Sequence, residues 1–128
     1  MKALLAPALL MVAAACATQH YVQAGQKDGV EVSYRWDHPE NGPSALLLRI
    51  VNGSDERRRV HAEIDLYYQG RTVEQFEADT VVAPHRTLSG RFNGFYFEPS
   101  SLSRDQLRSA ETTVELTTLT TEVAPNAQ

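Results

Sequence analysis

Hydrophobic and polar residues alternate along much of the chain beyond residue 29. The clearest stretch covers residues 59–69, in which one parity is apolar and the other is mostly polar. The apolar parity holds Val60, Ala62, Ile64, Leu66 and Tyr68, and the other holds His61, Glu63, Asp65 and Tyr67. A period of two is typical of a β-strand that buries one face. We therefore predict a strand here, with Ile64 and Leu66 in the core.

The same kind of pattern predicts most of the remaining chain as β-structure. Further strands are expected at residues 30–37, 45–51, 71–78, 80–83, 86–97 and 111–123. The segment 45–51 is apolar except for Arg49, which favours a central strand, whereas 71–78 follows a tight turn at Gly70 and is expected at an edge. One helix signal is present, because Ser103 and Gln106 have the spacing of a capping box, and it predicts a short helix near residues 103–109.

About seven strands, close turns and almost no helix describe an all-β protein with an immunoglobulin-like β-sandwich. A set of motifs between residues 48 and 97 also resembles FxLyD-type domains and related small envelope lipoproteins. These motifs are Ile50-Val51-Asn52-x-Ser54, Val60, Ile64-Asp65-Leu66-Tyr67-Tyr68-Gln69-Gly70 and Val82-x-Pro84. The resemblance implies an immunoglobulin-like sandwich in a bacterial surface protein, and the family has no catalytic residues to transfer to this chain.

Residues 87–97 contain a conflict of period. The apolar residues concerned are Leu88 and Phe92, of one parity, and Phe95 and Phe97, of the other. One regular strand cannot bury all four on a single face, because a shift of one residue exchanges the faces. Asn93-Gly94 lies between the two sets and tolerates positive φ, so we predict a bulge or sharp bend there that resets the phase.

The phase reset decides where the aromatic residues of this segment lie. With it, Phe95 and Phe97 enter the core and Tyr96 points outward; without it, Phe95 and Phe97 are exposed side by side. Because exposed aromatic residues are enriched at interface centres, Tyr96, Phe95 and Phe97 form the candidate partner surface. The alternative is that the short helix near residues 103–109 folds back and covers them.

The start of the chain has the character of an export signal. Lys2 is followed by an apolar stretch over residues 3–15, too short to span a bilayer, and Ala13 to Ala15 precede Cys16, the only cysteine. This resembles the bacterial lipobox, which implies cleavage before Cys16 and attachment of lipid to its thiol. A triacylated cysteine would anchor the protein stably in a membrane. In the alternative, signal peptidase cuts after Ala17 and releases a soluble protein.

These signals give the expected domain organisation and location. Residues 1–15 are the signal peptide, 16–29 the lipidated cysteine with its tether, 30–123 the sandwich and 124–128 a disordered tail. Under the sorting rule of enteric bacteria, Ala17 after the cysteine, instead of aspartate, implies the outer membrane. We expect the domain on the periplasmic side of that membrane.

Composition limits the chemistry of the mature chain. Removal of residues 1–15 takes away Lys2 and leaves 11 basic against 16 acidic residues, a poor balance for binding nucleic acid. Both methionines lie in the removed segment, and lipid would occupy the thiol of Cys16. The domain therefore has no sulfur ligand for Cu(I) or haem and no disulfide. The sequence indicates no cofactor, and an exported domain without disulfides must be held together by its apolar core.

The best candidate constellation is His61, Glu63 and Asp65, which share one face of the strand at 59–69. A metal site there would need another ligand, such as His38 or His85, and a solvated strand face is the simpler interpretation. No G-x-S-x-G motif and no glycine-rich phosphate loop is present. We therefore expect a non-catalytic binding or accessory module for an envelope protein or assembly. The alternatives are a small-ligand or metal-binding protein that uses the polar strand face and, third, a hydrolase.

Overall fold

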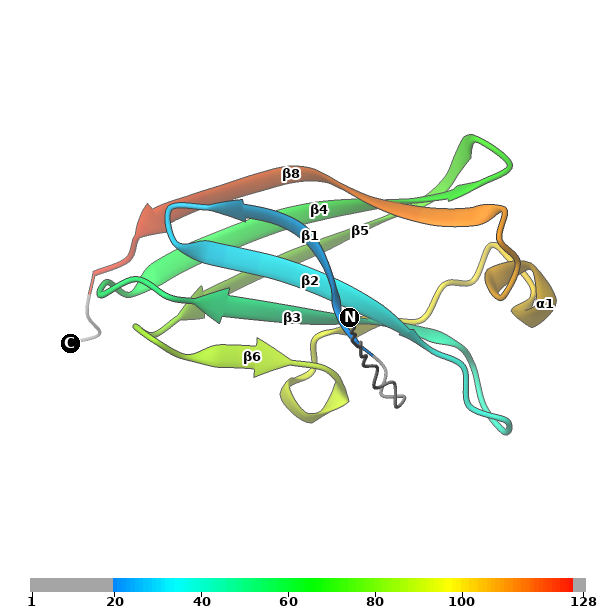
Figure 1. The fold of residues 1–128 in the computed structure, drawn as a ribbon, viewed down its shortest axis with the longest axis horizontal. Coiled ribbons are helices and arrows are strands. Elements are labelled where there is room, and N and C mark those ends of the chain that lie inside the picture. Colours follow the sequence, from blue (N-terminus) through cyan, green and yellow to red (C-terminus); the bar gives the residue numbers. More distant parts are fainter. Residues whose placement is uncertain (1–19, 126–128) are drawn as a thin grey trace, which may run out of the picture.

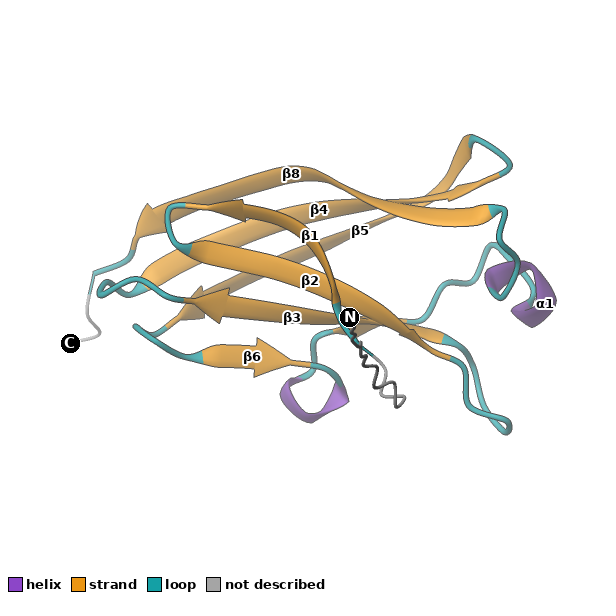
Figure 2. Cartoon of the chain, in the orientation of Figure 1, coloured by secondary structure: helices purple, strands orange, loops and turns teal. Residues whose placement is uncertain are grey.

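The computed structural model describes residues 20–125, which form two antiparallel sheets packed face to face (Figure 1, Figure 2). Sheet A has the order β1-β2-β3-β6, with β7 also pairing with β3, and sheet B has the order β5-β4-β8. The strands are β1 Val22–Lys27, β2 Val30–Asp37, β3 Ala45–Asn52, β4 Arg58–Tyr68, β5 Arg71–Val82, β6 Thr87–Ser89, β7 Tyr96–Phe97 and β8 Thr112–Val123. The fold is thus an all-β sandwich, as predicted.

Six of the described strands follow the order of an immunoglobulin-like sandwich. If β2, β3 and β6 are matched to strands A, B and E, then β4, β5 and β8 take the places of C, C′ and F. The chain changes sheets between β3 and β4, between β5 and β6, and between β7 and β8 (Figure 1). Within residues 20–125, β8 pairs with β4 alone, so its other edge has no strand partner.

The core lies between the sheets and uses the faces that the alternation predicts. In β4, the residues Val60, Ala62, Ile64 and Leu66 are buried, while the residues between them are half-exposed. Ala62, Ile64 and Leu66 pack in one cluster with Leu46 and Leu48 of the central strand β3, and Val60 packs in a second cluster with Ile50 of the same strand. β3 is buried along most of its length. The predicted face assignment of residues 59–69 is confirmed.

The first strand is where the structure departs most from the sequence prediction. β1 occupies residues 22–27, within the range 16–29 that we expected to be a tether. It pairs with β2 through a tight turn at Asp28 and Gly29, whose φ angles of 53° and 81° suit a type I′ hairpin. The tether prediction is therefore wrong for β1 and its turn, and the sandwich begins at Val22 instead of residue 30.

The segment predicted as one strand at 86–97 is broken in the way the phase conflict requires. β6 ends at Ser89, a 3₁₀ turn follows at Arg91–Asn93, and β7 then pairs with β3. Gly94 ends the turn in the left-handed region, with φ of 79°. The predicted bend is confirmed, and it rotates Phe95 and Phe97 toward the core, where Phe97 stacks on Phe76 with ring centroids 4.6 Å apart.

The remaining elements differ from the predictions only at their boundaries. The helix α1, Arg104–Leu107, has the predicted capping box between Ser103 and Gln106, and its Leu107 is buried in the core. Segments 71–78 and 80–83 form a single strand, β5. Ala124, expected in a disordered tail, is buried and donates its amide to the carbonyl of Arg57 at 2.8 Å, so that boundary is wrong.

The predicted signal peptide and Cys16 lie outside the described residues. Between residues 20 and 125, no helix has the length and apolar character required to cross a bilayer.

Candidate functional site

Three places in the structure deserve comparison as sites: the polar face of β4, the aromatic turn after β6, and a cleft between the sheets. On β4, His61 contacts Glu63, with 3.0 Å between Nε2 and Oε2. Its Nδ1 lies 3.4 Å from a carboxylate oxygen of Asp79 on β5. The hydrogen bond that His61 donates to the Glu63 carboxylate raises the pKa of His61 above its usual value, and Asp79 acts in the same direction. His61 is thus held between two acids on a partly solvated surface.

The rest of the predicted constellation is not brought to this point. Asp65 accepts a hydrogen bond from Gln75 at 2.8 Å and belongs to a separate group with Tyr67. His38 bonds to Ser44, and His85 bonds to Asp55. No group of three or more His, Cys, Asp or Glu residues within 20–125 is placed to hold a metal ion. The geometry of the β4 face is therefore that of paired polar side chains on a solvated sheet.

The candidate partner surface is divided by the bend. Phe95 and Phe97 are half-buried against the core, so of the three predicted aromatic residues only Tyr96 faces solvent, with 37% of its surface exposed. The Arg91 guanidinium carbon lies 4.9 Å from the centre of the Tyr96 ring. Phe92, one of the four residues in the predicted conflict of period but not part of the candidate partner surface, is 96% exposed at the tip of the turn.

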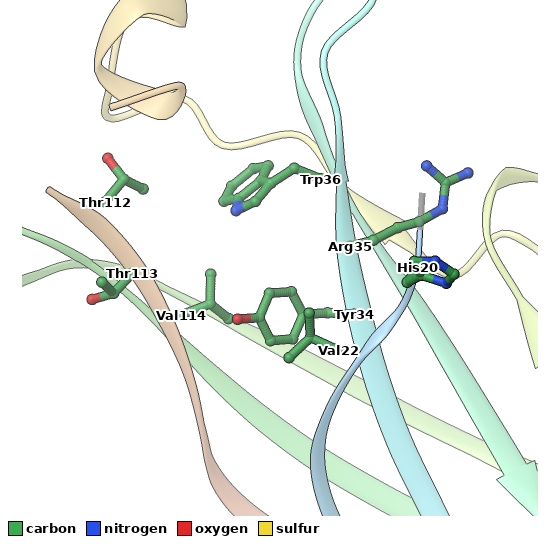
Figure 3. A pocket seen from close by; sticks show the side chains of 8 residues that line it. All are labelled: His20, Val22, Tyr34, Arg35, Trp36, Thr112, Thr113 and Val114. Carbon is green, nitrogen blue, oxygen red and sulfur yellow. The ribbon is translucent and has the colours of Figure 1, made fainter. Parts of the chain in front are cut away.

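A cleft opens between the end of β2 and the beginning of β8 (Figure 3). It has a volume of about 600 Å³. Its lining residues come from the start of β1, from β2 and from β8: His20, Val22, Tyr34, Arg35, Trp36, Thr112, Thr113 and Val114. In Figure 3 the rings of Tyr34 and Trp36 extend from β2 toward the threonines and Val114 of β8. The cleft is therefore an opening between the two sheets beside the core.

The shape of the cleft follows from how β1 relates to its neighbours. Near Gly25, β1 approaches β8 so closely that a Cβ atom on this glycine would lie 2.5 Å from a methyl carbon of Leu116. β1 begins at Val22, which pairs with Tyr34, whereas β2 continues to Asp37. The boundary between the edges of the two sheets, here called the seam, is therefore closed where Gly25 meets Leu116. It is open next to the end of β2, where β1 has not yet begun and the side chains of Tyr34 and Trp36 are only half-buried.

The cleft combines an apolar floor with a polar rim. Trp36 stacks on His38 with ring centroids 5.5 Å apart, and burial, together with the charge of Arg108, lowers the pKa of His38. Thr112 donates its hydroxyl to the carbonyl of Gln106 at 2.5 Å, which ties the start of β8 to the helix. A pocket of this size with aromatic walls and a few polar groups is the usual form of a binding site.

Sequence reasoning did not find this cleft. Tyr34 and Trp36 were predicted as members of a half-buried strand, which they are, but their neighbours on β8 lie almost eighty residues further along the chain. Comparison of the chain with protein-family models, with curated proteins and with solved structures gave no match. Its function is therefore inferred from its own geometry.

Proposed function

We propose that this protein is a lipid-anchored protein of the bacterial envelope that acts as a non-catalytic binding module. Its cleft between β2 and β8 receives an extended segment of a partner protein in the envelope. The observation that carries this proposal is the aromatic cleft beside the edge of β8, which has no strand partner among residues 20–125.

The chemistry of the cleft suits an extended peptide. A strand edge without a partner presents backbone N–H and C=O groups that an added strand can bind. Beside that edge, Tyr34, Trp36 and Val114 form an apolar recess for a side chain of the incoming segment. Backbone hydrogen bonds would supply affinity, and the recess would supply selectivity.

The anchor keeps this binding site near the membrane. Six residue steps separate Cys16 from Val22, the first residue of β1, and each step spans at most ~3.6 Å. The lipidated cysteine would therefore hold the sandwich within ~22 Å of the bilayer surface. A module on so short a tether can reach only partners that lie at the same membrane.

The anchor is tested by replacing the thiol. Cys16→Ser should move the protein from the membrane fraction to the soluble fraction, and mass spectrometry of the wild-type protein should find a lipidated Cys16 at the mature N-terminus. A variant that stays in the membrane pellet, or a mature N-terminus at Thr18, would contradict the proposed anchor.

The cleft is tested by crosslinking in the native cell. A photoreactive residue at Val22, which is exposed and lines the cleft, should yield a discrete crosslink to an envelope protein. Thr113→Arg at the rim should abolish that crosslink. Thr120→Arg, the same change at an exposed position toward the other end of β8, should preserve it. A crosslink that survives Thr113→Arg would contradict a partner bound in the cleft.

A further inference from the structure

The turn that follows β6 exposes an aromatic side chain on a fixed backbone. Phe92 is 96% exposed, and Gly90 and Gly94 on either side of it adopt positive φ angles of 60° and 79° that shape the turn. The Gly90 amide donates to Leu48 at 2.9 Å, and the Phe95 amide donates to Gly90 at 2.9 Å. The amide of Ser89 donates to the Asn93 side chain at 2.8 Å. The ring of Phe92 therefore projects into solvent from a turn whose backbone is held by these hydrogen bonds.

The N-terminal part of the chain approaches the sandwich at this same turn. A Cβ atom on Gly90 would lie 3.4 Å from the hydroxyl oxygen of Tyr21. The ring of Tyr21 lies against the outer face of sheet A, with its centre 5.4 Å from the guanidinium carbon of Arg35 and 5.8 Å from that of Arg49. In Figure 1 the turn after β6 and the start of β1 lie on the same side of the molecule.

The length of chain before Tyr21 limits how far this face can be from the anchor. Cys16 and Tyr21 are five residue steps apart, which is ~18 Å at full extension. The residue that would carry the lipid is therefore confined to the neighbourhood of Tyr21 and of the turn that contacts it. A membrane that holds Cys16 therefore lies within ~18 Å of Tyr21, close enough to touch the outer face of sheet A and this turn.

The side chains on this side have the chemistry of a membrane-contacting surface. Phe92 projects from the turn, and Tyr21 and Tyr96 each lie beside an arginine, an amphipathic pairing that suits the interface between water and lipid. Arg91 also pairs with Asp37 at 3.3 Å and Glu98 at 3.7 Å, which fixes its guanidinium over Tyr96. An aromatic residue among arginines is the arrangement that settles at the boundary between headgroups and acyl chains.

We infer that Phe92 and the adjoining outer face of sheet A rest on the phospholipid bilayer that holds the anchor, with the Phe92 ring inserted at the headgroup boundary. This inference rests on the proposed attachment of lipid at Cys16. It adds an orientation, in which sheet A faces the membrane and the outer face of sheet B faces away from it.

A vesicle experiment tests the orientation separately from lipidation in the cell. The chain from Cys16 to Gln128 contains every described element and a single thiol, which can be coupled to a maleimide phospholipid in vesicles of phosphatidylethanolamine and phosphatidylglycerol. Trp36 is the only tryptophan, so Trp36→Phe combined with Phe92→Trp places the sole indole at the turn. The matched control combines Trp36→Phe with Thr120→Trp, on the outer face of sheet B.

Brominated acyl chains should quench the indole at position 92 at least several-fold more than the indole at position 120, and should shift only the emission of the former to the blue. Equal quenching at the two positions, or none at position 92, would overturn the inference. A crosslink from position 92 to a protein in the cell, without quenching in vesicles, would assign the turn to a protein partner and would also overturn it.

A second measurement uses the unaltered sequence and so avoids any effect of the substitutions on folding. Amide hydrogen exchange in residues 89–96 should slow when the wild-type chain is coupled to vesicles, whereas exchange in β5 should not change. Unchanged exchange in residues 89–96 would count against the inference. The two proposals can fail separately. If position 92 is quenched in vesicles but Cys16→Ser does not release the protein from cell membranes, the lipid anchor is contradicted and the membrane-contacting surface is supported.

Discussion

At the scale of single residues, the buried face of β4 carries much of the stability. Leu66 is completely buried, and Asp65 lies on the opposite, partly solvated face of the same strand. Leu66→Ala should lower the free energy of unfolding by about 2–5 kcal/mol, because it leaves a cavity in the core. Asp65→Ala removes a hydrogen bond to Gln75 and should cost less than about 1 kcal/mol. Urea unfolding of both variants measures the difference, and equal losses would contradict the burial of this face.

Asn52 is completely buried, and all of its side-chain polar atoms are hydrogen-bonded. Its side-chain amide donates to the carbonyls of Glu56, Val82 and Ala83 at 2.8, 3.0 and 3.2 Å. Its side-chain oxygen accepts from the amide and hydroxyl of Ser54 at 3.0 and 2.7 Å. Asn52 thus joins the turn after β3 to the end of β5, which lies in the other sheet.

Removal of the Asn52 side chain should therefore be costly. Asn52→Ala leaves buried carbonyl groups without their donor, and we expect a loss of about 1–3 kcal/mol in the free energy of unfolding. Asn41→Ala, in the exposed loop after β2, is the matched control and should change stability by less than about 0.5 kcal/mol. Chemical denaturation separates the two, and a neutral Asn52→Ala would show that water replaces the lost donor.

At the scale of elements, the contact between β1 and β8 closes one end of the seam between the sheets. Gly25→Val would place side-chain atoms where a methyl group of Leu116 now lies, and should cost about 1–3 kcal/mol through overpacking. Leu116→Ala should relieve this strain, so the double variant should be more stable than the sum of the two single losses predicts. Thermal or urea unfolding of the double-mutant cycle measures the coupling, and strictly additive losses would indicate that the two strands do not press on each other.

The elements that the sequence predicted well are those with local signals. The alternation in residues 59–69 predicted the buried face of β4, and the spacing of Ser103 and Gln106 predicted the start of the helix. For β1 the sequence indicated at most a short strand at residues 20–23 within the tether. Its sequence, VQAGQK, has no apolar alternation, which is expected of an edge strand with little buried surface. The pair Asp28-Gly29 before a predicted strand was the signal that could have found it, since this pair favours a two-residue hairpin turn.

The candidate site depended on information that local patterns lack. The contact between His61 and Asp79 arises because an irregularity in pairing after Leu66 shifts the β4–β5 register by one residue. A regular hairpin counted from the turn at Gln69 and Gly70 would have placed Ala78 opposite His61. The cleft depends on where β1 ends relative to β2 and on the packing of two sheets, and neither follows from the sequence of any one strand.

At the scale of the whole molecule, the N-terminal strand links the two proposed surfaces. The chain passes Tyr21 on the outer face of sheet A and then enters β1, whose first residue lines the cleft on the other side of that sheet's edge. If a membrane contacts the outer face of sheet A, the mouth of the cleft therefore lies at the edge of the area that the membrane covers. A partner segment that lies along the membrane surface could enter it without displacing the domain.

The stability of the whole sandwich should respond to pH through two histidines with opposite effects. The Glu63 carboxylate holds the pKa of His61 above 6.5, so the stabilisation from the charged ring is full below about pH 6.5 and is lost as pH rises through the higher pKa of the folded state. Burial and the charge of Arg108 depress the pKa of His38, against a smaller opposing effect of Asp37. Its contribution is therefore present above about pH 6.5 and is lost as pH falls through the lower pKa.

Urea unfolding at about pH 5.5 and about pH 8 should therefore distinguish the two histidines, because substituting each one should change the free energy of unfolding differently at the two pH values. His61→Gln should destabilise the protein more at the lower pH, because only there does the wild-type ring carry the charge that Glu63 and Asp79 stabilise. His38→Gln should destabilise it less at the lower pH, because burial and the charge of Arg108 penalise protonation of wild-type His38 there. Glu63→Gln should weaken the pH dependence assigned to His61, of which Asp79 sustains the remainder, and should leave that of His38 unchanged. If both histidine variants shift in the same direction with pH, one of these two environments has been assigned incorrectly, and the response of Glu63→Gln identifies which.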